Sequence, residues 1–281
     1  MGIFRSNYDK PGPGVDKDAP KKKGLFLYLE LLKRKFGKLM QASMLLFVCS
    51  IPMMIVMSFI FFAFISGNLQ TLVEGLDEEQ KGSVMRLAII FGAVLSTTIL
   101  GSGPASAGFA YITRCFTREE HAWIMSDFFQ RYKENFKQSI IVSIVDVVAV
   151  TLGSNAIYFY FYTAQKYGTA IWMILSYISL MLMIVYMFMH IYIYQIMVTY
   201  ECKMKDLYKN SLILALGKAP MNILLMGITV IIVFLVYNYL GSLLGTILMF
   251  LLFMGFARFP VEFYAARTIS RIFISSSKGE E

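Results

Sequence analysis

Six times along this chain, a nearly uninterrupted apolar run of about 20 residues or more separates shorter charged segments. Such a run is long enough to cross a hydrocarbon core of about 30 Å as a helix whose backbone groups are all paired. The runs recur throughout the chain, so one cleavable signal peptide does not explain them. Of the 281 residues, 57% are hydrophobic and only 16% are charged. We therefore predict an all-α, polytopic membrane protein.

The apolar runs define the predicted domain organisation. We place six transmembrane helices at residues 39–66, 86–113, 138–163, 169–199, 219–240 and 242–262, with short cytoplasmic amphipathic helices between some of them. Together they form one transmembrane domain, residues 25–273. Residues 1–24 are rich in Pro, Gly and Lys and are expected to be a flexible cytoplasmic tail, and residues 274–281 a short cytoplasmic C-terminal tail.

The charges between the runs predict how the chain is oriented. Of its 26 lysines and arginines, 23 fall in the N-terminal segment, the second and fourth connections and the C-terminal segment. The other three, Lys81, Arg86 and Lys166, fall in connections on the opposite side. Basic residues concentrate on the cytoplasmic side of membrane proteins. Both termini are therefore predicted to be cytoplasmic, in the cell membrane.

The sequence offers no chemistry-bearing motif. It contains no Walker loop, GxSxG, HExxH, CxxC pair or His/Cys cluster, so we expect no catalytic residue, metal or cofactor, and no enzymatic activity. Cys49, Cys115 and Cys202 lie within or at the cytoplasmic ends of spans, which disfavours a structural disulfide. The net charge is +8, and the basic residues that produce it lie between the predicted membrane spans rather than on one face of a soluble domain. Nucleic acid is therefore not an expected partner, whereas the lipid bilayer is.

A weak internal repeat joins cytoplasmic amphipathic stretches to outward-going spans, at residues 27–47, 128–148 and 207–227. Each stretch has an aromatic residue near its start and basic residues before the span, although any outward-going helix with basic flanks would share some of this. In the second, Phe129, Tyr132 and Phe136 share one helical face. This helix is predicted over 117–137, starting at a Thr117–Glu120 capping box and lying on the membrane surface or against a partner.

Small residues and a proline interrupt the second predicted span at GSGPASAG, residues 101–108. Pro104 removes a backbone donor, so a kink is expected in the cytoplasmic half of the span. One interpretation is a broken helix that lines a polar cavity and offers freed backbone groups to a ligand. The other, which we favour, is a kinked helix whose small residues, Gly103 among them, let a neighbour pack closely.

Ionisable residues also lie inside predicted spans. Asp146 and His190 lie at similar depths in the third and fourth spans and could form a pair. A buried charge is costly, which makes a proton relay or polar-substrate site one hypothesis. A hydrogen bond between helices without further function is the other. Arg258 and Glu262, four residues apart at the end of the sixth span, are interpreted as an interfacial ion pair.

Four segments together resemble the YesL-like family of bacterial membrane proteins: VCSIPMMI (48–55), GPASAGFAYITR (103–114), DFFQRYKENFKQ (127–138) and KDLYKNSLILAL (205–216). The most specific positions are Gly103, Pro104, Arg114, Asp127, Phe128, Asn135 and Phe136. The resemblance implies a six-helix cell-membrane protein, mostly of Gram-positive bacteria, encoded near carbohydrate ABC importers and glycoside hydrolases. It implies no established activity. The long tail before residue 24 departs from the family pattern.

Two functional hypotheses follow, and a third stays open. The leading one is a non-catalytic accessory or regulatory component of a carbohydrate ABC uptake system that contacts permease subunits or their ATPase through the 117–137 helix. The alternative is a self-contained small-molecule carrier that uses the interrupted second span, Asp146 and His190. A membrane-assembly or sensory scaffold is the third.

Overall fold

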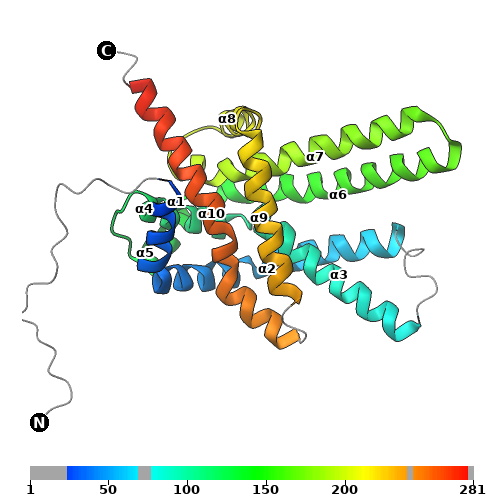
Figure 1. Ribbon diagram of the computed structural model, residues 1–281, viewed down its shortest axis with the longest axis horizontal. Helices are drawn as coiled ribbons and strands as arrows, with labels where there is room; N and C mark the ends of the chain where they lie inside the picture. Colours follow the sequence, from blue (N-terminus) through cyan, green and yellow to red (C-terminus); the bar gives the residue numbers. More distant parts are fainter. Residues whose placement is uncertain (1–23, 69–76, 239–242, 278–281) are drawn as a thin grey trace, which may run out of the picture.

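The computed structural model describes residues 24–68, 77–238 and 243–277, and these residues form helices without any strand (Figure 1). The helices, in chain order, are α1 Leu25–Arg34, α2 Phe36–Asn68, α3 Glu78–Ile99, α4 Pro104–Thr117, α5 Ile124–Glu134, α6 Phe136–Tyr167, α7 Ala170–Met197, α8 Met204–Gly217, α9 Ala219–Asn238 and α10 Leu243–Ser277. The predicted tails at residues 1–23 and 278–281 lie outside the described residues. The all-α prediction is confirmed.

Three helices, α2, α6 and α7, are each long and apolar enough to cross a membrane. They contain or nearly coincide with the predicted spans at 39–66, 138–163 and 169–199. A fourth crossing is possible if α8 and α9, which are bent by 93° relative to each other, are taken as one span. A multi-pass membrane protein is thus supported, while six spans remain a prediction.

The second predicted span, 86–113, is two helices rather than one kinked helix. Helix α3 ends at Ile99, and α4 starts after a turn in which Gly101 and Gly103 have φ of +99° and +62°. Pro104 is the first residue of α4, where the missing backbone donor costs nothing. The kink prediction was wrong because Gly101 and Gly103, both at positive φ, end the first helix before Pro104 can bend it.

The predicted 117–137 helix is also wrong in its extent. Helix α4 continues to Thr117, whose hydroxyl donates to the carbonyl of Thr113 instead of capping a new helix. Glu119 has φ of +61°, which ends the turn after α4. Helix α5 begins only at Ile124, and the Asp127 carboxylate accepts a hydrogen bond from the Trp123 backbone N–H at 2.8 Å. The capping function predicted for Glu120 therefore belongs to Asp127.

The threefold pattern has a structural counterpart. Helices α1 and α2 are separated by Lys35 alone, α5 and α6 by Asn135, and α8 and α9 by Lys218. These hinge residues have closely similar backbone angles, with φ between −121° and −96° and ψ between 9° and 23°. Each unit is a short helix, a one-residue hinge and a long apolar helix.

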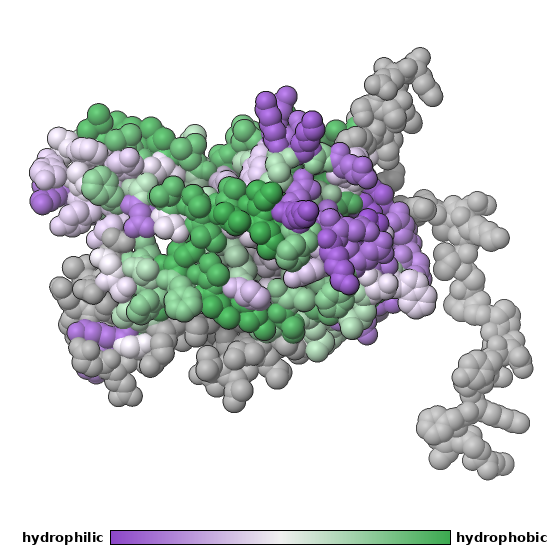
Figure 2. All heavy atoms as spheres, turned by 180° about the vertical axis from the view of Figure 1, so that it is seen from behind, coloured by the Kyte–Doolittle hydropathy of each residue, from purple (hydrophilic) through white to green (hydrophobic). Residues whose placement is uncertain are grey.

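Two long hairpins give the molecule its shape: α6 and α7, joined at the left-handed Gly168, and α2 with α3 (Figure 1). Helix α10 packs against α2, α9 and α4 near the centre. The face seen in Figure 2 is largely apolar, and hydrophilic side chains gather at the end that carries α1 and α5. Leu152 on α6 and Met181 on α7 are strongly exposed, as lipid-facing residues would be.

Candidate functional site

A polar cavity of about 730 Å³ lies where α4, the α5–α6 hinge and the α7–α8 connection meet. Its charged and amide side chains come from segments far apart in the sequence: Arg114, Arg131, Glu134, Asn135, Gln138, Glu201 and Lys203. The remaining lining is mostly the connection after α7, residues 197–202. The site therefore combines three cations with two carboxylates and two amides.

Arg114 joins α4 to the connection after α7. One of its guanidinium nitrogens, Nη1, donates to the carbonyl of Val198 at 2.7 Å and lies 3.4 Å from Thr199 Oγ1. Its Nε is buried and has no hydrogen-bond partner among the described residues. Burial, and next the charge of Arg118, lower the pKa of this guanidinium. Arg114 thus has one polar edge fixed by the protein and another unused.

Arg131 enters the cavity from α5. The guanidinium carbons of Arg131 and Arg114 lie 4.4 and 4.6 Å from the centroid of the Tyr111 ring, within the range of cation–π attraction. Arg131 also forms an ion pair with Glu134 at 2.6 Å. Tyr111 therefore holds two guanidinium groups close together, one of which is neutralised by Glu134.

Cys202 lines the same cavity, but its thiol is poorly placed to act as a nucleophile. Burial, together with the negative charge of Asp206, raises its pKa. A thiol needs a lowered pKa to be reactive at neutral pH.

Some of the residues on which the family resemblance rests line this cavity, and others lie in the helices around it. Arg114 and Asn135 line it. Phe128 is fully buried, and its backbone lies so close to α4 that a Cβ on Gly108 would come within 2.9 Å of the Phe128 carbonyl oxygen. Asp127 caps α5, as described above, and Phe136 is exposed at the start of α6. Of these positions, Phe128 packs α5 against α4, and Asp127 fixes the start of α5.

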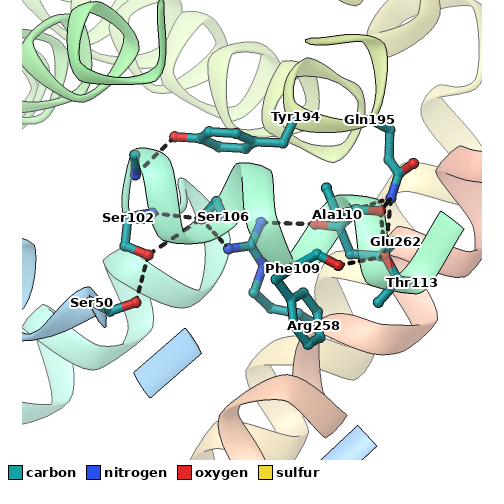
Figure 3. Close-up of polar contacts among 11 residues, drawn as sticks. Ser50, Ser102, Ser106, Phe109, Ala110, Thr113, Tyr194, Gln195, Arg258 and Glu262 are labelled. Atoms are coloured by element: carbon teal, nitrogen blue, oxygen red, sulfur yellow. Dashed lines mark hydrogen bonds and ion pairs between the residues drawn. The ribbon is translucent and has the colours of Figure 1, made fainter. Parts of the chain in front are cut away.

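The turn before α4 is packed and satisfied internally. The backbone N–H of Ser102 donates to Ser106 Oγ at 2.8 Å, and that of Gly103 donates to the Tyr194 hydroxyl at 3.2 Å (Figure 3). A Cβ on Gly103 would lie 2.6 Å from Ser143 Oγ. The small residues at the interruption therefore serve close packing, and the backbone N–H groups of Ser102 and Gly103 are bonded to the protein.

A buried polar network runs from this turn to α10 (Figure 3). Arg258 donates to Ser106 Oγ at 2.6 Å and to Glu262 at 2.9 Å, and the Gln195 amide donates to the other Glu262 oxygen at 2.6 Å. Arg258 and Glu262 are only 3% and 2% exposed. Their pairing was predicted and is confirmed, and Ser106 and Gln195 supply the partners that let the pair lie inside the protein. The interfacial depth of the pair stays a prediction.

Gln195 was not singled out from the sequence. Its amide also donates to the carbonyl of Ala110 and to Thr113 Oγ1, which ties α7 to α4 as well as to α10. The available signal was a long polar side chain in an apolar run, five residues after His190. Ser50 was missed too, and its hydroxyl lies 2.5 Å from that of Ser102.

Asp146 and His190 form a second buried cluster, between α6 and α7. His190 Nε2 lies 2.9 Å from Asp146 Oδ1, both side chains are fully buried, and the Tyr186 hydroxyl donates to the same oxygen at 2.5 Å. Asp146 Oδ2 and His190 Nδ1 have no hydrogen-bond partner among the described residues. The structure brings these two predicted residues together, but neither lines the polar cavity.

The described residues contain no group of three or more His, Cys, Asp or Glu side chains placed to hold a metal ion. The three cysteines are unpaired thiols, as their positions in the sequence predict.

Comparison with known proteins gives one match. Residues 39–153 match the family described as "Protein of unknown function, DUF624", a segment that runs from α2 into α6 and includes Arg114, Asp127 and Asn135. No curated protein and no solved structure matches the chain. The match is consistent with the YesL-like resemblance and gives no activity.

Proposed function

We propose that this chain is a six-span cell-membrane protein with cytoplasmic termini that serves as a non-catalytic accessory or regulatory subunit of a carbohydrate ABC uptake system. It binds the permease subunits or their ATPase through α5 and the connection before it. The YesL-like resemblance supports the type of partner, and the polar end of the molecule supports the place of contact.

The observation that carries this proposal is the exposed face of α5. Trp123, directly before α5, and Met125, in its first turn, are 71% and 63% exposed although they lie on the hydrophilic end of the molecule, and Phe129, one turn after Met125, is 37% exposed. Exposed clusters of large apolar side chains with a polar rim are typical of protein interaction sites, and Trp often dominates their energetics. Arg118, Glu120 and other charged residues supply that rim.

The exposed face is also rigidly mounted. Phe128 is buried against α4, Asp127 fixes the first turn of α5, and the Arg131–Glu134 pair spans its last turn. A preorganised surface loses less conformational freedom on binding, so more of its contact energy contributes to affinity.

The proposal predicts that Trp123→Ala combined with Met125→Ala will lower recovery of importer subunits by at least about tenfold, because exposed aromatic anchors carry much of the energy of an interface. The tagged protein is purified from native membranes of the host, and co-purifying proteins are identified by mass spectrometry. Leu152→Ala is the matched control, since Leu152 is 66% exposed on α6, away from α5.

Wild type and Leu152→Ala should both retain the importer subunits. Recovery of no permease or ATPase with the wild-type protein would contradict the proposal. If the double variant recovered as much importer subunit as the wild-type protein, α5 would not be the contact surface.

A self-contained carrier is a second candidate, favoured by the Asp146–His190 cluster. A fully buried ionisable pair that leaves Asp146 Oδ2 and His190 Nδ1 unpartnered is unusual for a purely structural contact in a membrane. This function requires uptake by vesicles that contain only this protein, and loss of that uptake in Asp146→Asn.

A further inference from the structure

An apolar groove of about 440 Å³ lies between α1, α9 and α10, away from the polar cavity. Its walls are made by side chains such as Tyr28 on α1, Leu224 and Ile228 on α9 and Phe263 on α10. Leu224 is strongly exposed, whereas Phe263 is buried at the base. The groove is therefore open on one side and continuous with the lipid-facing surface of α9.

One end of this groove is strongly basic. Arg267 and Arg271 both line it and are separated by one turn of α10. Neither forms an ion pair with any residue that the structure describes. Arg267 Nη1 is buried without a hydrogen-bond partner in the described part of the chain. The Arg267 guanidinium carbon lies 5.5 Å from the centroid of the Phe263 ring, so its described neighbours supply a cation–π contact and no anion.

The dimensions of the groove suit one lipid leaflet. From Pro260 to Arg271, α10 rises by roughly 17 Å at about 1.5 Å per residue, and half of a 30 Å hydrocarbon core is about 15 Å. A lipid in this groove therefore requires the membrane-embedded part of α10 to extend past residue 262, where the sequence places the end of the sixth span. Met221 and Ile232 mark a similar length of α9, which begins after the Lys218 hinge. A lipid with its headgroup at the arginines thus has its chain beside apolar residues throughout.

From this geometry we infer that the α1–α9–α10 groove binds an anionic phospholipid, with the phosphate between Arg267 and Arg271 and one acyl chain along α9 and α10. Guanidinium groups form bidentate hydrogen bonds with phosphate oxygens, and basic pockets between transmembrane helices on the cytoplasmic side bind anionic headgroups. The site is separate from the proposed α5 interface, so either proposal can fail without the other.

The test is native mass spectrometry of the full-length protein from nanodiscs that contain equal amounts of phosphatidylglycerol and phosphatidylcholine. We expect bound lipid to be enriched in phosphatidylglycerol, and the enrichment to fall roughly fivefold for Arg267→Gln and for Arg271→Gln, and further for both together. Lys209→Gln removes one exposed charge from α8 and should leave the enrichment unchanged. No enrichment with the wild-type protein would overturn the inference.

A photo-crosslinking residue placed at Leu224 identifies the occupant without disturbing the arginines. The inference requires an adduct with the mass of a phospholipid. An adduct with the chain's own N-terminal segment or with a second copy would overturn it. Inorganic phosphate added to nanodiscs of phosphatidylcholine alone should not raise thermal stability; stabilisation equal to that by phosphatidylglycerol would show an ion site without a lipid site.

Discussion

At the scale of single residues, the described part of the protein buries an acid–histidine group and an arginine–glutamate group. Asp146 is paired with His190 and Tyr186, and Arg258 with Glu262. A buried charge is tolerated only when partners replace water. Ser106 and Gln195 supply partners to the second group, although Gln195 Oε1 itself has no hydrogen-bond partner among the described residues. In the first group the unpartnered atoms, Asp146 Oδ2 and His190 Nδ1, belong to the ionisable side chains themselves, which makes that group the better candidate for proton movement.

The Asp146–His190 pair should show strong energetic coupling. Asp146→Leu and His190→Leu are each expected to lower the free energy of unfolding by about 3–5 kcal/mol, because each leaves the other polar group buried alone. The double variant should lose clearly less than the sum of the two. Denaturant unfolding in detergent measures all three proteins.

His121→Leu is the control for this cycle, because the other histidine is exposed and should change stability by no more than about 0.5 kcal/mol. Additive losses from the single variants would mean that the two side chains do not interact in solution.

At the scale of elements, single residues decide where helices stop. Lys35, Asn135 and Lys218 each end a short helix and start a long one at a similar backbone geometry. The α3–α4 turn uses Gly101 and Gly103 instead, both at positive φ. The negative φ at the three hinges is accessible to any residue. The positive φ at the turn favours glycine, which has no Cβ.

Gly103→Ala should therefore destabilise the protein by at least about 2 kcal/mol, since it combines an unfavourable φ with a contact of 2.6 Å between the new Cβ and Ser143 Oγ. Thermal unfolding in detergent provides the measurement. Gly227→Ala in α9 is the matched control, because a Cβ there meets no atom within 4 Å and alanine is the better helix former.

The control should leave the midpoint unchanged or raise it. A neutral Gly103→Ala would show that the α3–α4 turn relaxes easily and that its left-handed geometry is not required.

At the scale of the whole molecule, the hinges and hairpins separate a polar end from apolar arms (Figure 1, Figure 2). The far end of the α6–α7 hairpin carries aromatic residues, including Tyr160 stacked on Trp172 with ring centroids 6.0 Å apart. Aromatic residues of this kind favour the membrane–water interface. These residues mark an interface on either side of a membrane, so the orientation comes from the charges: the end with α5 and α8 is rich in Lys and Arg and is the predicted cytoplasmic side, and the hairpin end near Gly168 the predicted outer side.

This orientation predicts which engineered cysteines react in intact cells. In a chain with the three native cysteines replaced, Gln165→Cys near the hairpin turn should react with a membrane-impermeant maleimide, and Lys209→Cys on α8 only after permeabilisation. The cysteine-free parent reports background. Labelling of Lys209→Cys in intact cells would reverse the predicted orientation.

The sequence by itself determined the all-helical class and the long helices α2, α6 and α7, because apolar length acts locally along the chain. The one-residue hinges at Lys35, Asn135 and Lys218 were seen only in the structure. The sequence also placed Asp146 and His190 at similar depths, which allowed a pair, and the structure shows that they meet. Only the tertiary structure decided that the span before Pro104 is broken, because a kink and a break differ in the φ of two glycines that Tyr194 and Ser143 pack against. Only the tertiary structure likewise showed that Arg258 and Glu262 are buried inside the protein. Ser106 and Gln195, which form hydrogen bonds with them in place of water, come from other helices.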